Sequence, residues 1–131
     1  MHALVVDDSR AMRRIVSGIL STLAFETVEA DNGASALTEL ERLTAAGTVP
    51  ALACIDWNMP VMDGLELVSA VRAERRWRDI TLMMVTTESE HGQIVRALAA
   101  GAHEYLIKPF TADAMEDKLR YLGLVPAGVG A

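Results

Sequence analysis

The stretch ALACIDWNMPVMDG, residues 51–64, joins five apolar residues to a loop that contains proline and glycine. Residues 51–55 have the length and the unbroken apolar character of a strand that is covered on both faces. Asp56 follows this strand directly, ahead of the chain breakers Pro60 and Gly64. In open α/β folds, ligands bind at the edge of the sheet where such strands end. Asp56 is therefore the first candidate for a functional residue.

Three further apolar runs, at residues 3–6, 80–85 and 105–107, alternate with helical patterns on either side of this stretch. Residues 25–30 are of mixed polarity, which suits a strand nearer the edge of the sheet. A fivefold alternation of strand and helix predicts a doubly wound α/β fold, with a five-stranded parallel sheet and five helices. The helical faces comprise Met12, Ile15, Val16, Ile19, Leu20 and Leu23; Leu37, Leu40 and Leu43; Leu65, Val68 and Val71; Ile94, Val95, Leu98 and Ala99; and Ala112, Met115, Leu119 and Leu122.

The chain of 131 residues has a formal net charge of −6, which argues against nonspecific binding of nucleic acid. It contains neither an apolar stretch long enough to span a bilayer nor a secretory signal pattern. We therefore expect a cytoplasmic protein that binds neither DNA nor membrane. The length predicts one domain at residues 1–123 and a flexible tail at 124–131. Cys54 lies in an apolar run, where a cysteine more often packs as a small hydrophobe than acts in redox chemistry.

Polar side chains follow four of the predicted strands, namely Asp7 and Asp8, Asp56, Thr86 and Lys108. Parallel strands end at the same edge of a sheet, so these side chains are expected to converge. Carboxylates about 4 Å apart repel by about 4 kcal/mol per pair at an effective dielectric constant of about 20. Oxygen ligands select Mg²⁺, Ca²⁺ or Mn²⁺, and a partly open set of acids suits Mg²⁺ better than a closed Ca²⁺ site. The set has the chemistry of a Mg²⁺-assisted phosphoryl acceptor.

Each of these residues also has an ordinary structural explanation. Asp8 or Ser9 could serve only as the cap of the following helix. Asp56 alone would more often be a loop residue, and Lys108 before Pro109 would more often be a solvated lysine. The order of these residues on successive strands is what argues against a coincidence.

The segments VVDD (5–8), DWNMPVMDG (56–64), VT (85–86) and IKPF (107–110) together resemble response-regulator receiver domains, and most closely the single-domain chemotaxis regulators of that family. The resemblance covers nearly the whole chain. It implies a flavodoxin-like sheet with strand order 2-1-3-4-5. It also implies a sensor histidine kinase, or a histidine phosphotransfer protein, as the phosphoryl donor.

The resemblance implies specific roles at the site. Asp56 matches the phosphoacceptor, and Asp8 and Asp56 match direct Mg²⁺ ligands. The backbone carbonyl of Asn58 matches a third protein ligand, and Asp7 matches an acid that acts through a metal-bound water. Hydrolysis at the same site would return the protein to its resting form, so we expect no enzyme activity beyond its own phosphorylation and dephosphorylation.

The resemblance also implies a switch and an output surface. Thr86 matches a hydroxyl that moves to the phosphoryl group, Lys108 matches the amine that pairs with it, and Lys108-Pro109 matches a cis peptide bond. Tyr105 matches an aromatic residue that fills the space left by Thr86, although a strand tyrosine can simply pack on its neighbours.

The implied output surface is the fourth helix, fifth strand and fifth helix, with Ile94, Tyr105 and Lys118 as candidate contacts. A flagellar motor switch is one partner of such a surface, and a role as relay intermediate or phosphate sink is the alternative. We expect a monomer.

The two residues that follow Thr86 in the sequence are expected to tune the lifetime of the phosphoryl group. Thr87 stands where many receivers carry a very small residue, so we expect it to slow entry of small phosphodonors and attack by water. Glu88 could orient water, or be a first-turn acid that favours the helix dipole.

Two other functions deserve comparison. A metal-dependent phosphatase with an aspartate nucleophile usually has a second acid two residues later, where this chain has Asn58, and it needs a cap insertion that the chain lacks. A scaffold that has lost phosphorylation would not need the intact set of acids, threonine and lysine.

Overall fold

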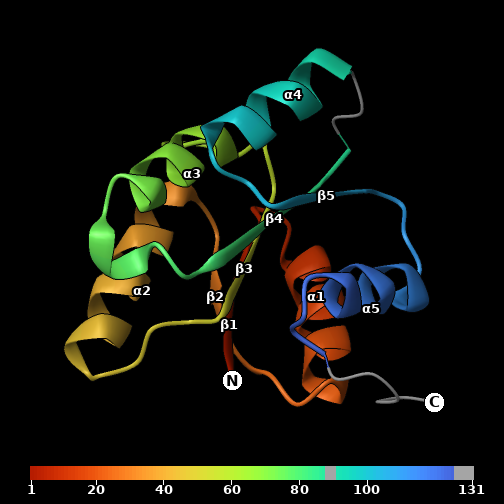
Figure 1. Cartoon of the computed structure of the whole chain (residues 1–131), viewed down its shortest axis with the longest axis horizontal. Helices are drawn as coiled ribbons and strands as arrows, with labels where there is room; N and C mark the ends of the chain where they lie inside the picture. The colour runs from red at the N-terminus through yellow and green to blue at the C-terminus, as the bar shows by residue number, and fades with distance from the viewer. Residues whose placement is uncertain (88–90, 126–131) are drawn as a thin grey trace.

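The computed structural model describes residues 1–87 and 91–125 and contains one parallel sheet (Figure 1). Its strands lie in the order β2-β1-β3-β4-β5. Fold class and strand order are therefore confirmed, and each predicted strand boundary lies within one residue of the observed one. The strands are β1 (His2–Val6), β2 (Glu26–Ala30), β3 (Leu52–Ile55), β4 (Thr81–Thr86) and β5 (Glu104–Ile107).

Helices follow the strands, and most begin at a side-chain cap. Ser9, Asn32 and Thr111 each accept a hydrogen bond from a backbone N–H of the first turn, as does Asp63, whose partner Glu66 completes a capping box. Because Ser9 caps the first helix, Asp8 is left available for another role. The helices are α1 (Arg10–Thr22), α2 (Gly33–Ala45), α3 (Gly64–Arg72), the 3₁₀ turn η1 (Arg75–Trp77), α4 (His91–Ala100) and α5 (Ala112–Tyr121).

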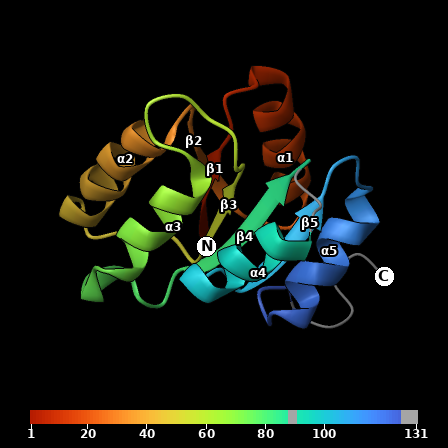
Figure 2. The ribbon, with the colours of Figure 1, turned by 90° about the horizontal axis from the view of Figure 1, so that it is seen from above.

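Helices cover both faces of the sheet (Figure 2). The sheet separates two apolar cores, as expected for strands covered on both faces. One core packs the sheet against α2, α3 and α4, and the other packs it against α1 and α5. Cys54 faces the second core, where burial raises the pKa of its thiol to about 12, so it packs as a hydrophobe. Leu124 and Val125 lie in the stretch that was expected to form a flexible tail, yet both pack against this second core.

The predicted face of α4 is confirmed at Ile94 and wrong at Val95, Leu98 and Ala99. Val95 and Leu98 are 48% and 44% exposed, whereas Ala97 is fully buried and Ile94 packs beside it. Two of the large side chains of α4 therefore lie on its outer side, and a small residue is the one that is fully buried. Within residues 1–87 and 91–125, none of the helices has the length and apolar character needed to cross a membrane.

Arg72, the last residue of α3, ties together the edge of the sheet opposite Asp56. Its guanidinium donates to the carbonyls of Gly101 at 2.9 Å, Arg78 at 3.0 Å and Ile80 at 2.7 Å. It also lies 3.0 Å from Nδ1 of His103, and burial together with this cation lowers the pKa of that imidazole. The contacts fix the start of β4 and β5, and thereby the register that brings Thr86 and Lys108 to the opposite edge.

Candidate functional site

The acids at the ends of β1 and β3 meet in the structure. Oxygen atoms of Asp7, Asp8 and Asp56 all lie within 4.8 Å of one another. Asp7 and Asp56 are buried, and Asp8 is exposed. Solvent therefore reaches the cluster from the side of Asp8. The predicted convergence of strand ends therefore occurs.

Lys108 supplies the positive charge of this cluster. Its Nζ lies 2.7 Å from Oδ2 of Asp7 and 3.4 Å from Oδ2 of Asp56. The side chain comes from the end of β5, and the Lys108–Pro109 peptide bond that follows is cis. The amine thus lies between two buried carboxylates, where it offsets their mutual repulsion.

Asp56 is held at both carboxylate oxygens. The N–H of Trp57 donates to Oδ1 at 2.8 Å, and Oδ2 faces Lys108. Burial raises the pKa of Asp56, and the charge of Asp7 adds to this, while a hydrogen bond from Thr86, Lys108 and the Trp57 N–H oppose it. The hydroxyl of Thr86, at the end of β4, is therefore a direct neighbour of the Asp56 carboxylate.

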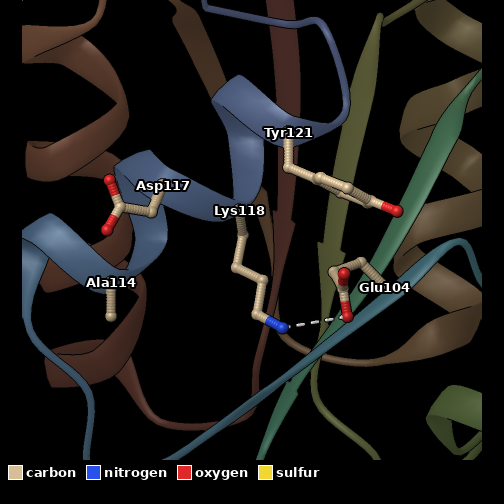
Figure 3. Close-up of a pocket in the computed structure, with 5 residues that line it drawn as sticks. All are labelled: Glu104, Ala114, Asp117, Lys118 and Tyr121. Atoms are coloured by element: carbon tan, nitrogen blue, oxygen red, sulfur yellow. Dashed lines mark ion pairs between the residues drawn. The ribbon is translucent and has the colours of Figure 1, made fainter.

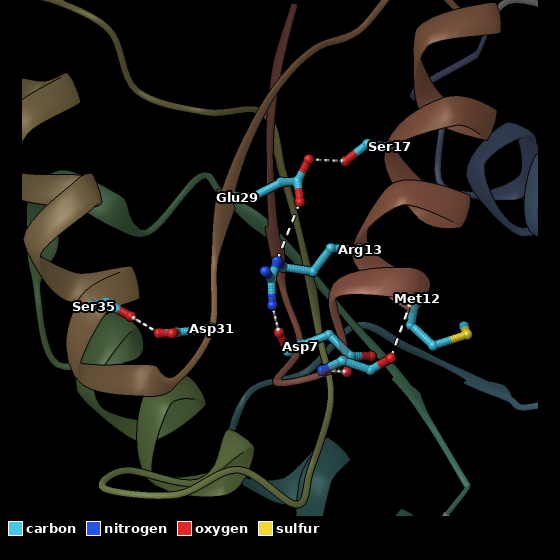
Figure 4. A network of polar contacts seen from close by, with 8 residues as sticks. Asp7, Met12, Arg13, Ser17, Glu29, Asp31 and Ser35 are labelled. Atoms are coloured by element: carbon cyan, nitrogen blue, oxygen red, sulfur yellow. Dashed lines mark hydrogen bonds and ion pairs between the residues drawn. The ribbon is translucent and has the colours of Figure 1, made fainter.

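Asp7 is fixed by a polar network that runs to β2 (Figure 4). The N–H of Ser9 donates to Oδ1 of Asp7 at 2.9 Å, and Arg13 donates to the Asp7 backbone carbonyl at 2.8 Å. Arg13 also pairs with Glu29 at 3.2 Å, which in turn accepts from Ser17. The network orients Asp7 with its other oxygen toward Lys108.

The donor set fits a hard divalent cation. Carboxylate oxygens at this spacing, with an exposed acid on the open side, match the habit of Mg²⁺, which uses few protein ligands and keeps several waters. Asn58 is exposed at the start of the loop after β3, so its carbonyl belongs to the same edge. Asp7, Asp8, Asp56 and the Asn58 carbonyl are the candidate ligands.

Residues 3–120 match the family model of the response regulator receiver domain. The chain belongs to this family. It is 43% identical to chemotaxis protein CheY1 of Helicobacter pylori strain J99, over 91% of this chain and 94% of that protein. It is also 43% identical to a chemotaxis protein CheY homolog of Campylobacter jejuni, over 100% of this chain and 98% of the relative.

Solved structures agree with this assignment. The structure of the chemotaxis response regulator CheY4 of Vibrio cholerae matches with a TM-score of 0.81 and 32% identity, over 92% of this chain and 97% of that one. The protein is thus a CheY-like response regulator of two-component signalling. Receiver domains are signalling proteins rather than enzymes that turn over an independent substrate.

The candidate output residues of the receiver lie around β5. Tyr105 is 7% exposed and belongs to the core beneath α4, and Ile94 packs against that core. Lys118 instead lies at the surface, where it pairs with Glu104 at 3.1 Å (Figure 3). These two residues line a cavity of about 470 Å³ together with Tyr121, which is 82% exposed.

Glu104 and Tyr121 were not among the predicted site residues. The position of Tyr121 at the end of an amphipathic pattern does not distinguish a surface aromatic from a core one, so only the packing reveals its exposure.

Thr87 lies at the mouth of a second cavity. It is exposed and lines a space of about 380 Å³ beside Lys108 and Pro109, whose remaining walls are largely apolar. Glu88, the other expected tuning residue, lies outside the described residues. The other lining residues are Met12, Ile15 and Phe110.

Proposed function

We propose that this receiver accepts a phosphoryl group on Asp56 from a phosphohistidine of a sensor histidine kinase or histidine phosphotransfer protein. The observation that carries the proposal is the position of Lys108, whose amine lies between the carboxylates of Asp7 and Asp56 at an open edge of the sheet. A cation so placed stabilises charge on a transferring phosphoryl group. The apolar cavity beside Lys108 supports docking of a protein donor next to the acceptor.

In the proposed transfer, an oxygen of Asp56 attacks phosphorus, and the bond between phosphorus and the histidine nitrogen breaks with its electron pair on the imidazole. Lys108 pairs with an equatorial oxygen of the phosphoryl group, and Thr86 donates to another. Asp8, Asp56 and the Asn58 carbonyl would hold Mg²⁺, with Asp7 acting through a bound water, and the metal when bound supplies further neutralisation of charge. Attack by water later releases phosphate and restores the carboxylate.

The proposed output is a population shift that Thr86 and Tyr105 transmit. Thr86 already contacts Asp56, and Tyr105 packs in the core beneath α4. Tyr105 is already buried here, so the structure has the arrangement that the proposal assigns to the phosphorylated form. A phosphoryl group that accepts from Thr86 would raise the population of this state over one in which Tyr105 is exposed, and so alter the surface of α4, β5 and α5. Both relatives are chemotaxis proteins by name, which supports an output partner in chemotaxis, such as a flagellar motor switch.

The test is detection of the acyl phosphate itself. The purified protein is incubated with acetyl phosphate and Mg²⁺, and the adduct is measured by intact mass and located by reductive trapping of the aspartyl phosphate. We expect one adduct, at Asp56, that does not form when the metal is chelated before the donor is added. An adduct at another residue, or none with acetyl phosphate or with a panel of phosphorylated donor proteins, contradicts the proposal.

Thr87→Ala is expected to shorten the lifetime of the phosphoryl group several-fold. The β-branched side chain stands at the cavity beside Lys108, and its removal opens a path for water toward Asp56. The decay of the adduct after donor removal measures this lifetime. Thr87→Val, which keeps the bulk without the hydroxyl, should retain the wild-type lifetime. An unchanged lifetime in Thr87→Ala would show that Thr87 does not limit access of water to the phosphoryl group.

A further inference from the structure

Arg96 makes a contact that the proposed transfer does not use. Its guanidinium carbon lies over the ring of Trp57, 5.7 Å from the ring centroid. A separation below about 6 Å is that of a cation–π interaction. Arg96 is exposed on α4, whereas Trp57 is the residue after the acceptor and is 7% exposed. The contact therefore connects a surface position on α4 with the first residue of the acceptor loop.

Trp57 in turn orients the acceptor. Its N–H donates to Oδ1 of Asp56 at 2.8 Å, while Lys108 faces Oδ2 at 3.4 Å. The Trp57 ring packs in the same core as Ala97, the neighbour of Arg96 on α4, and as Tyr105. The ring thus packs against the core and is also contacted by the Arg96 guanidinium. A movement of the ring that turned the Trp57 backbone would change the direction of the N–H that donates to Asp56.

We propose that Arg96 is a positioning residue of the acceptor site, which acts through Trp57. Its cation over the indole fixes the start of the loop after β3, and thereby the orientation of the Asp56 carboxylate for attack on phosphorus. The charged groups that act directly on Asp56 are Lys108 and Asp7, so Arg96 exerts its effect through the ring. The functional part of this inference rests on the proposed role of Asp56.

The same contact links the acceptor to the output surface. Since Arg96 lies on the exposed side of α4, a partner that binds this helix and draws the guanidinium off Trp57 would weaken the hold on Asp56. Coupling between two sites is reciprocal, so a modified Asp56 would change how firmly Arg96 is held. Arg96 thus gives α4 a route to the acceptor in addition to the one through Tyr105.

The first experiment measures amide hydrogen exchange at Trp57 by NMR, because that N–H is the one bonded to Asp56. We expect Arg96→Gln to speed exchange at Trp57 by about two- to fivefold, the factor that corresponds to an exposed cation–π contact. Arg96→Lys, which keeps a cation, should restore slow exchange in large part. Arg75→Gln removes an exposed arginine from η1, at the opposite edge of the sheet, and should leave Trp57 exchange unchanged.

The second experiment measures the rate of phosphorylation by acetyl phosphate in a double-mutant cycle. Arg96→Gln should slow the reaction by about two- to fivefold in the wild-type background, and have no further effect in Trp57→Leu, which lacks the ring. Equal effects in both backgrounds would show that Arg96 does not act through Trp57. If Trp57→Leu fails to fold, rescue of the rate by Arg96→Lys takes its place, and failure to rescue counts against the proposal.

The two experiments separate this inference from the proposed function. Failure of the wild-type protein to form an adduct would contradict the proposed function. The rate of amide hydrogen exchange at Trp57 in Arg96→Gln would still test whether Arg96 positions Trp57. Normal phosphorylation together with unchanged exchange in Arg96→Gln would overturn the inference alone.

Discussion

Replacement of Asp56 by asparagine is expected to abolish the phosphoryl adduct, a loss of at least about a thousandfold in phosphorylation rate. The amide preserves the shape of the side chain and can still accept from the Trp57 N–H, but it is not a nucleophile for phosphorus. Intact mass after incubation with acetyl phosphate and Mg²⁺ measures the effect. Asp79→Asn removes an exposed acid elsewhere and should be phosphorylated normally.

The same substitution is expected to raise stability by about 1 kcal/mol at neutral pH. Burial raises the pKa of Asp56, so its ionised form destabilises the fold above that pKa. As the pH falls through the raised pKa, the native state takes up a proton and the penalty is relieved. The advantage of Asp56→Asn should therefore shrink toward acid pH, which urea unfolding at several pH values can measure. Equal pH profiles for the two proteins would contradict this account.

Gly64→Ala is expected to be severely destabilising, by about 3 kcal/mol, and to impair phosphorylation as well. A Cβ at Gly64 would lie 2.9 Å from the carbonyl carbon of Asp56 and 3.0 Å from Cα of Trp57, and closer still to the Asp56 carbonyl oxygen. These are backbone atoms, so no side-chain rotation relieves the clash. Relief requires movement of the start of α3 or of the acceptor itself.

Thermal and urea unfolding measure the loss, and the adduct assay measures the displacement of the acceptor. Gly18→Ala is the matched control, since a Cβ there meets no atom within 4 Å and Gly18 lies inside α1. That substitution should stabilise the protein by about 0.5 to 1 kcal/mol. A Gly64→Ala protein with wild-type stability and phosphorylation would show that the approach of α3 to Asp56 is not tight.

The strands and the convergence of Asp7, Asp56 and Lys108 could be predicted because parallel connectivity brings strand ends together whatever the packing details. Apolar runs marked four of the strands to within one residue, and β2 was found from a segment of mixed polarity at the edge of the sheet. The acids, threonine and lysine were visible because each directly follows such a run.

The parts that escaped prediction depend on how side chains lie in space. On α4, Val95 and Leu98 are larger than Ala97, so a hydrophobic pattern favours them for the core, yet Ala97 is the α4 residue that is fully buried, with Ile94 packed against the same core. The contacts of Arg96 with Trp57 and of Arg72 with the carbonyl of Gly101 join segments that are far apart in sequence. No local pattern marks them.

The burial of Cys54 has a practical consequence for spectroscopy. It is the sole cysteine of the chain, and at a thiol pKa of about 12 it has almost no thiolate to react with maleimides at neutral pH. A cysteine introduced on the exposed side of α4, at Val95 for example, would therefore be labelled selectively by a fluorophore or spin label without first removing a native thiol. The wild-type sequence can therefore serve directly as the parent for labelled variants that report changes in the position of α4.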